Sequence, residues 1–428
     1  MIIKTREQVQ QEALNALIRN NGGLIAMEVG TGKSKVAVDY IKHSKAKNIL
    51  ITSPRTNLKD NWFKEISKWT TYIFVHSFDD SKFFEDETLH KFRVVLENIQ
   101  TCYKWSDELK KFDLIILDEI HVLATPEYGK LIQLAKSLNI TMVGLTGTPE
   151  LYKEEKRLFY EQYCPIVYQY FRSAEDGFVN KTKYIIYEHE LNNADKIWAG
   201  TKKNRFQKGE LEQYEYLSKA LKQAQIGMMR EGSENWFEDA SEWGWKGNGT
   251  KGQKFAAIKY LNAIKYRKEF LWNLTSTARI ARSIADSILS NKENKVLIFS
   301  ELTKQTDAIS NYPVHSNISD KDNKITIDSF NQGIIRELGS VRSLQLGLNL
   351  VGANWAIFES YNGSPTGAKQ SQGRLQRLDA NDIAHVVIIR VVNTQYDTWF
   401  EGFTKLLKIT DSNSIVVNSI TQFNDIMR

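Results

Sequence analysis

Short apolar runs alternate with longer amphipathic stretches in the first 150 residues. The runs have the length and composition of buried strands, and they are Leu24–Met27, Asn48–Thr52, Arg93–Leu96, Leu114–Leu117 and Thr141–Leu145. The stretches between them predict helices and include Lys33–Lys42, Leu58–Trp69 and Tyr128–Leu138. Apolar strands that alternate with helices are typical of a parallel sheet covered by helices on both faces.

The same alternation returns after residue 290. The strands predicted there are Lys295–Ser300, Ile334–Leu338, Trp355–Glu359 and Ala384–Val391. We therefore expect an α/β fold with two parallel-sheet domains of similar kind.

The segment between these two regions has a different pattern. Strand-like runs are missing from residues 191–290, and Leu211–Arg230 and Phe255–Leu289 predict long helices. A flexible connection is expected between the helices because four glycines fall there, namely Gly244, Gly247, Gly249 and Gly252. The expected domains are thus 1–190, a helical and basic insertion over 191–290, and 291–428.

The composition restricts the class of protein. The chain has 428 residues, of which 42% are hydrophobic and 25% charged, so it is long enough for two or three domains with buried cores and is not mostly disordered. Two cysteines are too few for a disulfide framework or a cysteine-based zinc cluster. His43, His189 and His315 have no partners at metal-ligand spacing. With no apolar leader and no stretch near the length of a membrane span, we expect a cytoplasmic protein without membrane contacts.

The excess of positive charge lies in the middle segment. Fifty-seven basic and 51 acidic residues give a net charge of +6, and residues 191–290 alone hold 17 basic and 11 acidic residues, again +6. Residues 244–268 contain no acidic residue and seven basic ones, namely Lys246, Lys251, Lys254, Lys259, Lys265, Arg267 and Lys268. Such a run favours contact with nucleic-acid phosphates, for which Lys251, Lys254 and Lys259 are the candidates.

Aromatic residues accompany this basic run. Phe255, Tyr260 and Tyr266 interleave with the lysines, and Trp236, Trp243 and Trp245 precede them. Exposed aromatic rings stack on bases or wedge between strands, whereas buried ones pack helix against helix. For the three tryptophans we favour packing, because large aromatic side chains are usually found in cores.

A glycine-rich loop carries the sharpest chemical signal. Gly30-Thr31-Gly32-Lys33-Ser34 follows a predicted strand and precedes a predicted helix. Glycines let backbone N–H groups approach phosphates closely, Lys33 would reach the β- and γ-phosphates, and the Ser34 hydroxyl would complete a Mg²⁺ shell. The full Walker spacing requires glycine where Met27 stands. The alternative interpretation is a glycine-rich turn that caps a helix.

Two further groups would complete a hydrolysis site. Asp118-Glu119-Ile120-His121 follows a buried strand, so that Asp118 would hold Mg²⁺ through water and Glu119 would activate the attacking water. Arg374 and Arg377 lie three positions apart on a predicted helix and would meet the γ-phosphate. The alternatives are a solvated acidic loop or helix cap for the first group and an ordinary basic helix surface for the second.

These groups, in this order, resemble the superfamily 2 helicases and translocases, and within them the Swi/Snf-type DNA translocases. Gln10 matches the glutamine that reads adenine in that family, Thr52-Ser53-Pro54-Arg55 matches its strand-contacting motif Ia, and Asn61–Ile66 resembles its tryptophan-containing helix. Thr146-Gly147-Thr148 matches motif III, which with His121 links nucleotide state to domain movement. The resemblance implies ATP and Mg²⁺ as cofactors and two RecA-like domains.

The second half of the chain carries the remaining motifs. Val296–Ser300 resembles motif IV, the run from Gly347 to Asn354 resembles the Swi/Snf motif V, and Gln370–Arg377 resembles motif VI with its two arginine fingers. The resemblance implies nucleic-acid contacts from Thr52, Pro54, Arg55, Ser300, Gly347 and Asn349, and a nucleotide contact from Gln370. The usual Asp-Glu-Ala-His and Gly-Lys-Thr of the family are Asp-Glu-Ile-His and Gly-Lys-Ser here.

The resemblance favours an ATP-driven translocase on double-stranded DNA. A strand-separating or branch-migrating helicase on DNA or RNA, and a catalytically inactive nucleic-acid-binding scaffold, are the alternatives. Type III restriction motor subunits share much of the motif set, but they need a nuclease region that we do not find. The compact, lysine- and asparagine-rich chain suggests a minimal motor from a bacterium or bacteriophage. The sequence does not identify a protein partner.

Overall fold

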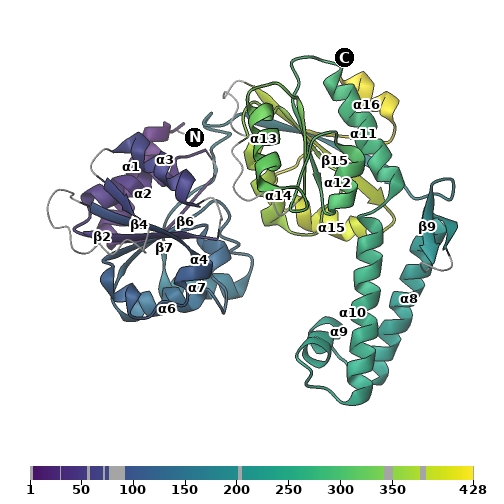
Figure 1. Cartoon of the computed structure of the whole chain (residues 1–428), viewed down its shortest axis with the longest axis horizontal. Helices are drawn as coiled ribbons and strands as arrows, with labels where there is room; N and C mark the ends of the chain where they lie inside the picture. Colours follow the sequence, from purple (N-terminus) through teal and green to yellow (C-terminus); the bar gives the residue numbers. More distant parts are fainter. Residues whose placement is uncertain are drawn as a thin grey trace. The chain divides into compact units, whose positions relative to one another are not determined.

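The computed structural model describes residues 3–28, 30–54, 58–70, 73–76, 92–200, 205–341, 350–375 and 382–427. The chain forms two compact units, each built around its own sheet (Figure 1). The chain leaves the first unit at Lys181. The two-domain α/β architecture expected from the sequence is confirmed.

The first unit contains a seven-stranded sheet in the order β3-β4-β2-β5-β6-β1-β7, in which every neighbouring pair is parallel. Its strands are β1 (Gly23–Met27), β2 (Asn48–Ser53), β3 (Ile73–His76), β4 (Phe92–Asn98), β5 (Leu114–Asp118), β6 (Thr141–Thr146) and β7 (Ile166–Tyr170). Its longer helices are α1 (Arg6–Asn20), α2 (Lys33–His43), α3 (Leu58–Trp69), α6 (Gly129–Ser137) and α7 (Glu154–Tyr163). Two single-turn helices, α4 (Ile99–Cys102) and α5 (Ile120–Leu123), and the 3₁₀ turn Glu108–Lys111 complete it.

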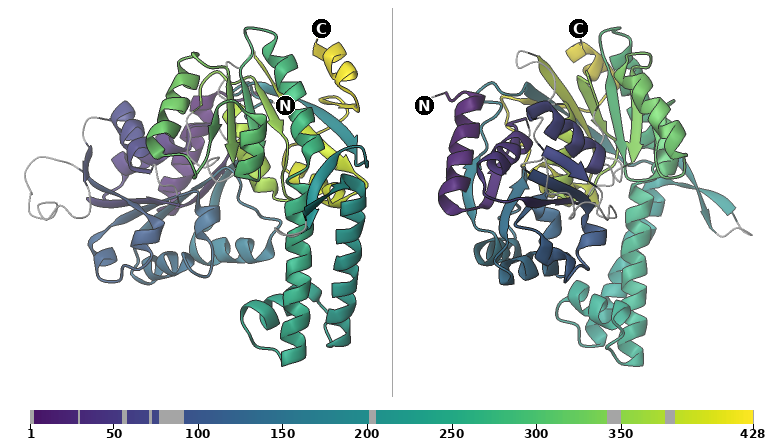
Figure 2. Two further views of the ribbon diagram at one scale, coloured as in Figure 1. Left: turned by 45° about the vertical axis from the view of Figure 1, so that its right-hand side comes forward. Right: turned by 60° about the vertical axis from the view of Figure 1, so that its left-hand side comes forward.

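Successive side chains along the strands of the first unit contribute to two cores, one on each face of the sheet. On β2, Ile49 and Ile51 pack with residues of α1–α3, whereas Leu50 packs with residues of α4–α7. Because successive side chains of a strand point to opposite faces, a continuous apolar run serves both cores. Helices accordingly cover both faces of this sheet (Figures 1 and 2).

The second unit also has a seven-stranded sheet, in the order β12-β13-β11-β14-β15-β8-β16. Its strands are β8 (Lys181–Glu190), β11 (Val296–Ser300), β12 (Pro313–Val314), β13 (Glu337–Val341), β14 (Trp355–Phe358), β15 (Ile383–Val392) and β16 (Ser414–Val417). Its helices outside the middle segment are α11 (Thr275–Leu289), α12 (Thr303–Ile309), α13 (Asp320–Asn331), α14 (Pro365–Leu375), α15 (Gln395–Thr404) and α16 (Ile420–Met427). The pairs along β12-β13-β11-β14-β15 are parallel, as is the pair of β8 and β16.

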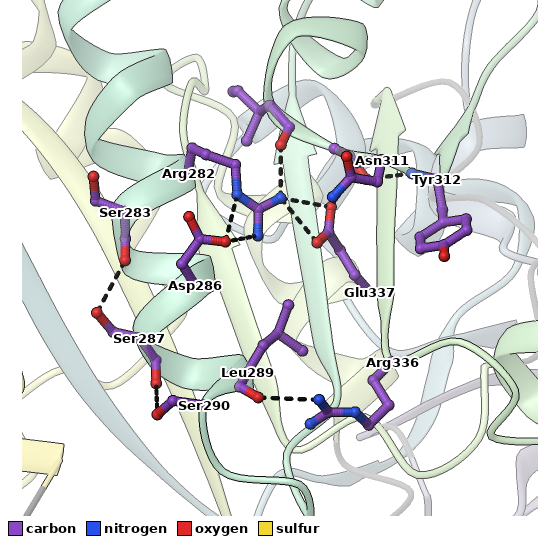
Figure 3. A network of polar contacts seen from close by, with 12 residues as sticks. Arg282, Ser283, Asp286, Ser287, Leu289, Ser290, Asn311, Tyr312, Arg336 and Glu337 are labelled. Atoms are coloured by element: carbon purple, nitrogen blue, oxygen red, sulfur yellow. Dashed lines mark hydrogen bonds and ion pairs between the residues drawn. The ribbon is translucent and has the colours of Figure 1, made fainter.

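A polar network fastens α11 to this sheet (Figure 3). The Arg282 guanidinium donates to the Glu337 carboxylate at 2.8 Å and to the Ile309 carbonyl at 2.9 Å, and it pairs with Asp286 one turn along the helix. Glu337 is 3% exposed and also accepts from the Asn311 N–H. Because each oxygen of this buried carboxylate has a donor, the network positions α11 beside β13.

A helical protrusion, residues 210–271, extends from the second unit (Figure 1). It consists of α8 (Glu210–Arg230), α9 (Trp236–Ala240), a π-helical turn (Ser241–Trp245) and α10 (Lys251–Leu271), and an antiparallel hairpin of β9 (Lys196–Gly200) and β10 (Arg205–Gly209) precedes it. Helices α8 and α10 lie side by side around a small core with Leu221, Met228, Ala257 and Tyr260.

Four details of the predicted organisation differ from the structure. The division at residue 190 is displaced, because β8 (Lys181–Glu190) already belongs to the second sheet. The middle segment contains the β9–β10 hairpin, which was not expected. The predicted helix Phe255–Leu289 is two helices separated at residues 272–274. The strand predicted at Ile334–Leu338 begins and ends three residues later.

The glycine segment is the fifth difference. A flexible connection was expected, but Gly244 lies in the π-helical turn and Gly252 lies in α10. A methyl group on Gly244 would come within 3.0 Å of Leu261, and one on Gly249 within 3.0 Å of Trp243. These two glycines therefore permit close packing of the turn against its neighbours. Within the described ranges, no helix is long and apolar enough to cross a membrane.

Candidate nucleotide site

The predicted motifs of the first unit leave the sheet at one edge. Ala26 of β1 pairs with Thr146 of β6, and Asp118 of β5 pairs with Leu145 of the same strand. Strands β1, β6 and β5 are parallel neighbours, so the glycine loop, Thr146 and Asp118 all follow carboxyl ends of adjacent strands. At a spacing of about 5 Å between neighbouring strands, the outer two strands are about 10 Å apart.

The glycine loop adopts the conformation that a phosphate cradle requires. Gly30 and Gly32 have φ angles of +83° and +88°, which residues with a side chain rarely adopt. Thr31 between them is fully buried, and its hydroxyl donates to the Glu28 carbonyl at 2.7 Å. A Cβ atom on Gly30 would clash with Val179, and one on Gly32 with Gln10. Both the backbone conformation and the surroundings thus require glycine at the two positions.

Lys33 begins α2 directly behind this loop. Its amine donates to the carbonyl oxygens of Met27 and Glu28 at 2.9 and 3.3 Å. Helix α2 has no side-chain cap and no acidic residue in its first turn, whereas α1 carries a complete capping box from Thr5 and Gln8. An uncapped helix start presents its N–H groups and the positive end of its dipole to an anion.

Gln10 lies beside the glycine loop, as the resemblance implies. Its side-chain amide donates to the Thr31 carbonyl at 2.9 Å, although the two residues are 21 positions apart. Helix α1 brings Gln10 there, because Val9, Ala13 and Leu17 of the same helix are buried in the first core.

Asp118 is held by two donors. Its Oδ1 accepts from the Glu119 N–H at 3.0 Å, and its Oδ2 accepts from the Trp62 indole N–H at 3.2 Å. Trp62 is 3% exposed and lies on α3. This contact of Trp62 could not be predicted beyond the family resemblance, since no spacing signal connects a helix residue with a carboxylate 56 positions away. The two hydrogen bonds fix the carboxylate plane of Asp118.

His121 joins the end of β5 to the end of β6. Its Nδ1 lies 2.9 Å from the Thr146 hydroxyl and 3.5 Å from a Glu119 carboxylate oxygen, while its Nε2 lies 3.5 Å from the Thr148 hydroxyl. Thr146 also accepts from the Thr148 N–H at 3.0 Å. The structure thus brings together all three residues for which a coupling role was predicted, and it places Glu119 beside them. Glu119 itself has a φ of +51°, an uncommon conformation for a residue with a side chain.

Lys156 holds the turn that carries His121. It lies on α7, is 7% exposed, and its amine donates to the His121 and Ala124 carbonyls at 2.6 and 2.5 Å. Burial lowers the pKa of the Lys156 amine. The amine caps the carbonyl end of α5, a single turn that carries His121. This role of Lys156 could not be predicted from the sequence, because nothing in the surrounding residues distinguishes it from an ordinary surface lysine such as Lys153.

The residues predicted to contact nucleic acid have mixed positions. Lys251, Lys254 and Lys259 are exposed on α10. Thr52 is fully buried with its hydroxyl 3.1 Å from the Cys102 sulfur, and Ser300 is 2% exposed, so neither side chain reaches the surface. The Pro54 carbonyl accepts from Gln100. Arg55, Gly347, Asn349 and Arg377 lie outside the described residues, as do the side chains of Gln370 and Arg374.

The side chains at the first sheet edge fit a magnesium nucleotide. Mg²⁺ prefers oxygen ligands, and the Ser34 hydroxyl and the Asp118 carboxylate are of this kind. The glycine loop and Lys33 supply N–H and ammonium donors for phosphate oxygens.

One cluster of metal-ligand type lies elsewhere in the described part of the chain. Ligand atoms of His189, Asp195 and Glu210 lie within 4.8 Å of one another, which the sequence spacing did not suggest. Hydrogen bonds from Arg279 lower the pKa of Asp195, and Glu210 accepts from the Thr275 and Ser276 N–H groups at the start of α11. An arginine and a helix start thus already donate hydrogen bonds to both carboxylates.

Two family models match the chain. Residues 3–151 match the model described as type III restriction enzyme, res subunit, and residues 279–379 match the helicase conserved C-terminal domain. The DNA 3'-5' translocase XPB2 of Sulfurisphaera tokodaii is 30% identical over 168 residues, which are 39% of this chain and 36% of that protein.

Two further proteins are similar. A SWI/SNF-related matrix-associated actin-dependent regulator of chromatin, subfamily A, containing DEAD/H box 1 homologue of Drosophila melanogaster is 29% identical over 148 residues, 30% of this chain and 17% of that protein. The helicase domain of Pyrococcus furiosus Hef has the same fold, with a TM-score of 0.55 and 15% identity over 93% of this chain and 99% of that one.

The matched segments therefore span about a third and a sixth of the lengths of the two sequence relatives. These matches do not support the expectation of a minimal or phage-encoded motor. They do agree with the order of the motifs and with the two parallel-sheet domains. The chain belongs to superfamily 2 of the helicases and translocases.

Proposed function

We propose that this protein is an ATPase that depends on nucleic acid and moves along double-stranded DNA. The observation that carries the proposal is the group of side chains at the carboxyl edge of the first sheet. There the glycine loop, Lys33, the oriented Asp118 and the pair of Glu119 and His121 follow neighbouring strands. That the matched relative from Sulfurisphaera is called a DNA translocase supports DNA as the track.

Each residue has a task in this proposal. Bound Mg²⁺-ATP supplies the phosphoryl group and a metal charge that offsets the charge developing on it. Lys33 exchanges the carbonyls of Met27 and Glu28 for phosphate oxygens, and Ser34 and Asp118 hold the metal. Glu119 orients the attacking water and accepts its proton. Gln10 reads the base from its position next to the loop, and Gln370 is proposed to contact the nucleotide.

Coupling is assigned to the hydrogen bonds that join β5 to β6. His121 contacts Glu119 and Thr146, and Thr146 accepts from the Thr148 N–H. A change in the position of Glu119 would therefore reach the loop after β6 through three successive contacts. Arg374 and Arg377 remain our candidates for the arginines that contact the γ-phosphate, and the exposed lysines of α10 for contacts with DNA phosphates.

A panel of nucleic acids tests the proposal. ATP turnover is measured alone and with blunt duplex DNA, single-stranded DNA and RNA, and we expect duplex DNA to stimulate it most. The Glu119→Gln variant should lose stimulated turnover, while Glu154→Gln, an exposed acid on α7, should retain it. Stimulation by single-stranded DNA or RNA alone would favour a strand-separating helicase. The absence of stimulation by every nucleic acid would refute the proposal.

A further inference from the structure

The helical protrusion has two chemically opposite parts. Residues 231–245 contain five acidic residues and no basic one, whereas residues 251–268 of α10 contain six basic residues and no acidic one. The acidic residues are Glu231, Glu234, Glu238, Asp239 and Glu242. Both parts also expose aromatic side chains. Because the two parts carry opposite charge, we expect their aromatic side chains to bind different partners.

One face of α10 is packed and the other is exposed. Ala256, Ala257 and Tyr260 are buried in the core that α10 shares with α8. Phe255 and Tyr266 are 61% and 56% exposed. At 100° and 1.5 Å per residue, an interval of eleven residues closes three turns with a remainder of about 20° and spans about 16 Å. The two rings therefore lie nearly in line along the exposed face.

Lysines occupy the same exposed face. Lys251, Lys254, Lys259 and Lys265 are exposed there, and Ile258 between them is 51% exposed. The Lys259 ammonium lies 4.3 Å from the centre of the Phe255 ring. The single acidic residue of α10, Glu269, lies 3.9 Å from Lys265. The face thus combines aromatic rings with positive charge over its whole length.

This combination fits unpaired nucleotides. Phosphates need only the lysines, and two large, solvent-exposed rings add nothing to a contact with the backbone of a duplex. Unpaired bases offer a free π-face on which such rings can stack, and stacking tolerates any base sequence. A protein partner with an acidic surface would satisfy the lysines but would not require two aligned rings.

We propose that the exposed face of α10 binds a single-stranded segment of DNA, with Phe255 and Tyr266 stacked on bases and the lysines on the adjoining phosphates. This inference rests on the proposed function and deepens it. The substrate is then a DNA that has an unpaired strand next to a duplex, such as a fork or a branch.

The same protrusion provides a matched control. Phe237 and Trp245 are 53% and 69% exposed, and their rings contact edge to face at 6.2 Å. They lie within the acidic part, where like charge repels phosphates. Loss of these two rings removes as much exposed aromatic surface from the protrusion without touching the face of α10.

The test compares two double variants of the full chain, Phe255→Ala with Tyr266→Ala and Phe237→Ala with Trp245→Ala. Binding of fluorescent oligothymidine, a blunt duplex and a forked duplex is measured by anisotropy. The first variant should weaken binding of oligothymidine and fork at least about tenfold and of blunt duplex less than about twofold, and the second should change none of them. Lys254→Gln with Lys259→Gln should weaken all three ligands and reduce their salt dependence.

The outcomes separate this inference from the proposed function. An equal loss on all three DNAs in the first variant, no loss at all, or an equal loss in the second variant would each overturn the inference. Nucleic-acid stimulation of the unmodified protein decides the proposed function independently. Thermal unfolding of both variants checks that the solvent-exposed substitutions leave the fold intact.

Discussion

In both sheets, parallel strands end at one carboxyl edge, but the side chains at the two edges make different contacts. In the first unit, left-handed glycines, the half-buried Lys33 and the Asp118 carboxylate lie at that edge. In the second unit, the strands β11 and β14 end at Ser300 and next to Glu359 and Ser360, which are all at most 3% exposed. The first edge presents donors and charges to a ligand, whereas the second edge is closed by its own side chains.

Glu359 explains what the closed edge does. Its Oε1 accepts from the Thr277 hydroxyl at 2.5 Å and from the Gln305 amide at 2.9 Å, and burial raises its pKa. Gln305 also donates to the Leu274 carbonyl, which lies just beyond the C-terminal end of the protrusion. Next to these contacts, the Trp272 indole donates to the Tyr361 carbonyl at 3.0 Å. The carboxyl edge of the second sheet therefore anchors the base of the protrusion. The comparison shows that a few residues decide whether such an edge binds a ligand or packs against its own chain.

Replacement of Lys33 should give the largest effect. Lys33→Ala removes the ammonium that the proposed site offers to phosphate oxygens, so turnover should fall about a thousandfold. Lys35→Ala is the control, because Lys35 lies on the same helix and pairs with Asp39 at the surface. Steady-state ATPase assays measure both. Equal activities in the two variants would show that the first edge is not the nucleotide site.

Replacement of Glu359 tests the contacts at the carboxyl edge of the second sheet. Glu359→Ala should lower the free energy of unfolding by about 2–4 kcal/mol, because it removes an acceptor that the buried Thr277 and Gln305 side chains share and opens a cavity. Glu359→Gln should cost less than about 1 kcal/mol, since the amide has the shape of the neutral acid. Denaturant unfolding at constant pH measures both. Similar losses in the two variants would show that an amide does not replace the carboxyl group at this position.

The pH dependence of the free energy of unfolding tests the same carboxyl group. The folded-state pKa of Glu359 is raised above its unfolded value. Its contribution is therefore fully present below the unfolded pKa of about 4.5 and is lost as pH rises through the folded pKa. The stability of Glu359→Gln relative to the unmodified protein should accordingly increase with rising pH.

Replacement of Trp62 should disturb the carboxyl edge of the first sheet less than replacement of Lys33. Trp62→Phe keeps a ring in the core but removes the N–H that holds Asp118, so turnover should fall about tenfold. The loss should appear in kcat at saturating ATP and be partly offset by higher Mg²⁺. Trp69→Phe on the same helix removes an indole bond to Glu65 and should leave turnover unchanged. An unchanged kcat in Trp62→Phe would show that Asp118 is held without the indole.

Much of the first edge was predictable because it follows from strand order. Apolar runs identified β1, β5 and β6, and parallel strands end at the same edge, so Lys33, Asp118 and Thr146 were expected to gather there. The structure also places His121 in contact with Thr146, and a coupling role for the two residues stays a prediction.

The remaining features depend on contacts that no local pattern encodes. The Trp62 bond to Asp118 joins a helix to a strand end across 56 positions, and Lys156 reaches His121 across 35. Strand β8 pairs with β16, more than 200 residues later, so its sheet could not be read from its own residues. Gly249 was assigned to a flexible loop because flexibility and close packing both select glycine.

Replacement of His385 should have the smallest effect. It tests whether burial keeps titratable groups uncharged in the core of the second unit, as at its carboxyl edge. Its ring stacks on Trp355 with the ring centres 4.3 Å apart, and its Nδ1 is buried with no hydrogen-bond partner in the described part of the chain. Burial, with a smaller effect of Lys183, lowers the pKa of His385 to about 4. Unfolding restores a pKa near 6.5, so protonation favours the unfolded chain between these values.

Acidification should therefore destabilise the protein through His385. Stability that is present above pH 6.5 is lost as pH falls towards 4, and the midpoint of thermal unfolding should fall by a few degrees between pH 7 and 5. His385→Phe keeps the stacked ring and cannot be protonated, so part of this fall should disappear in the variant. If both proteins lose the same number of degrees, the imidazole is already charged in the folded state, and the second unit does not exclude charge from its core as the raised pKa of Glu359 indicates.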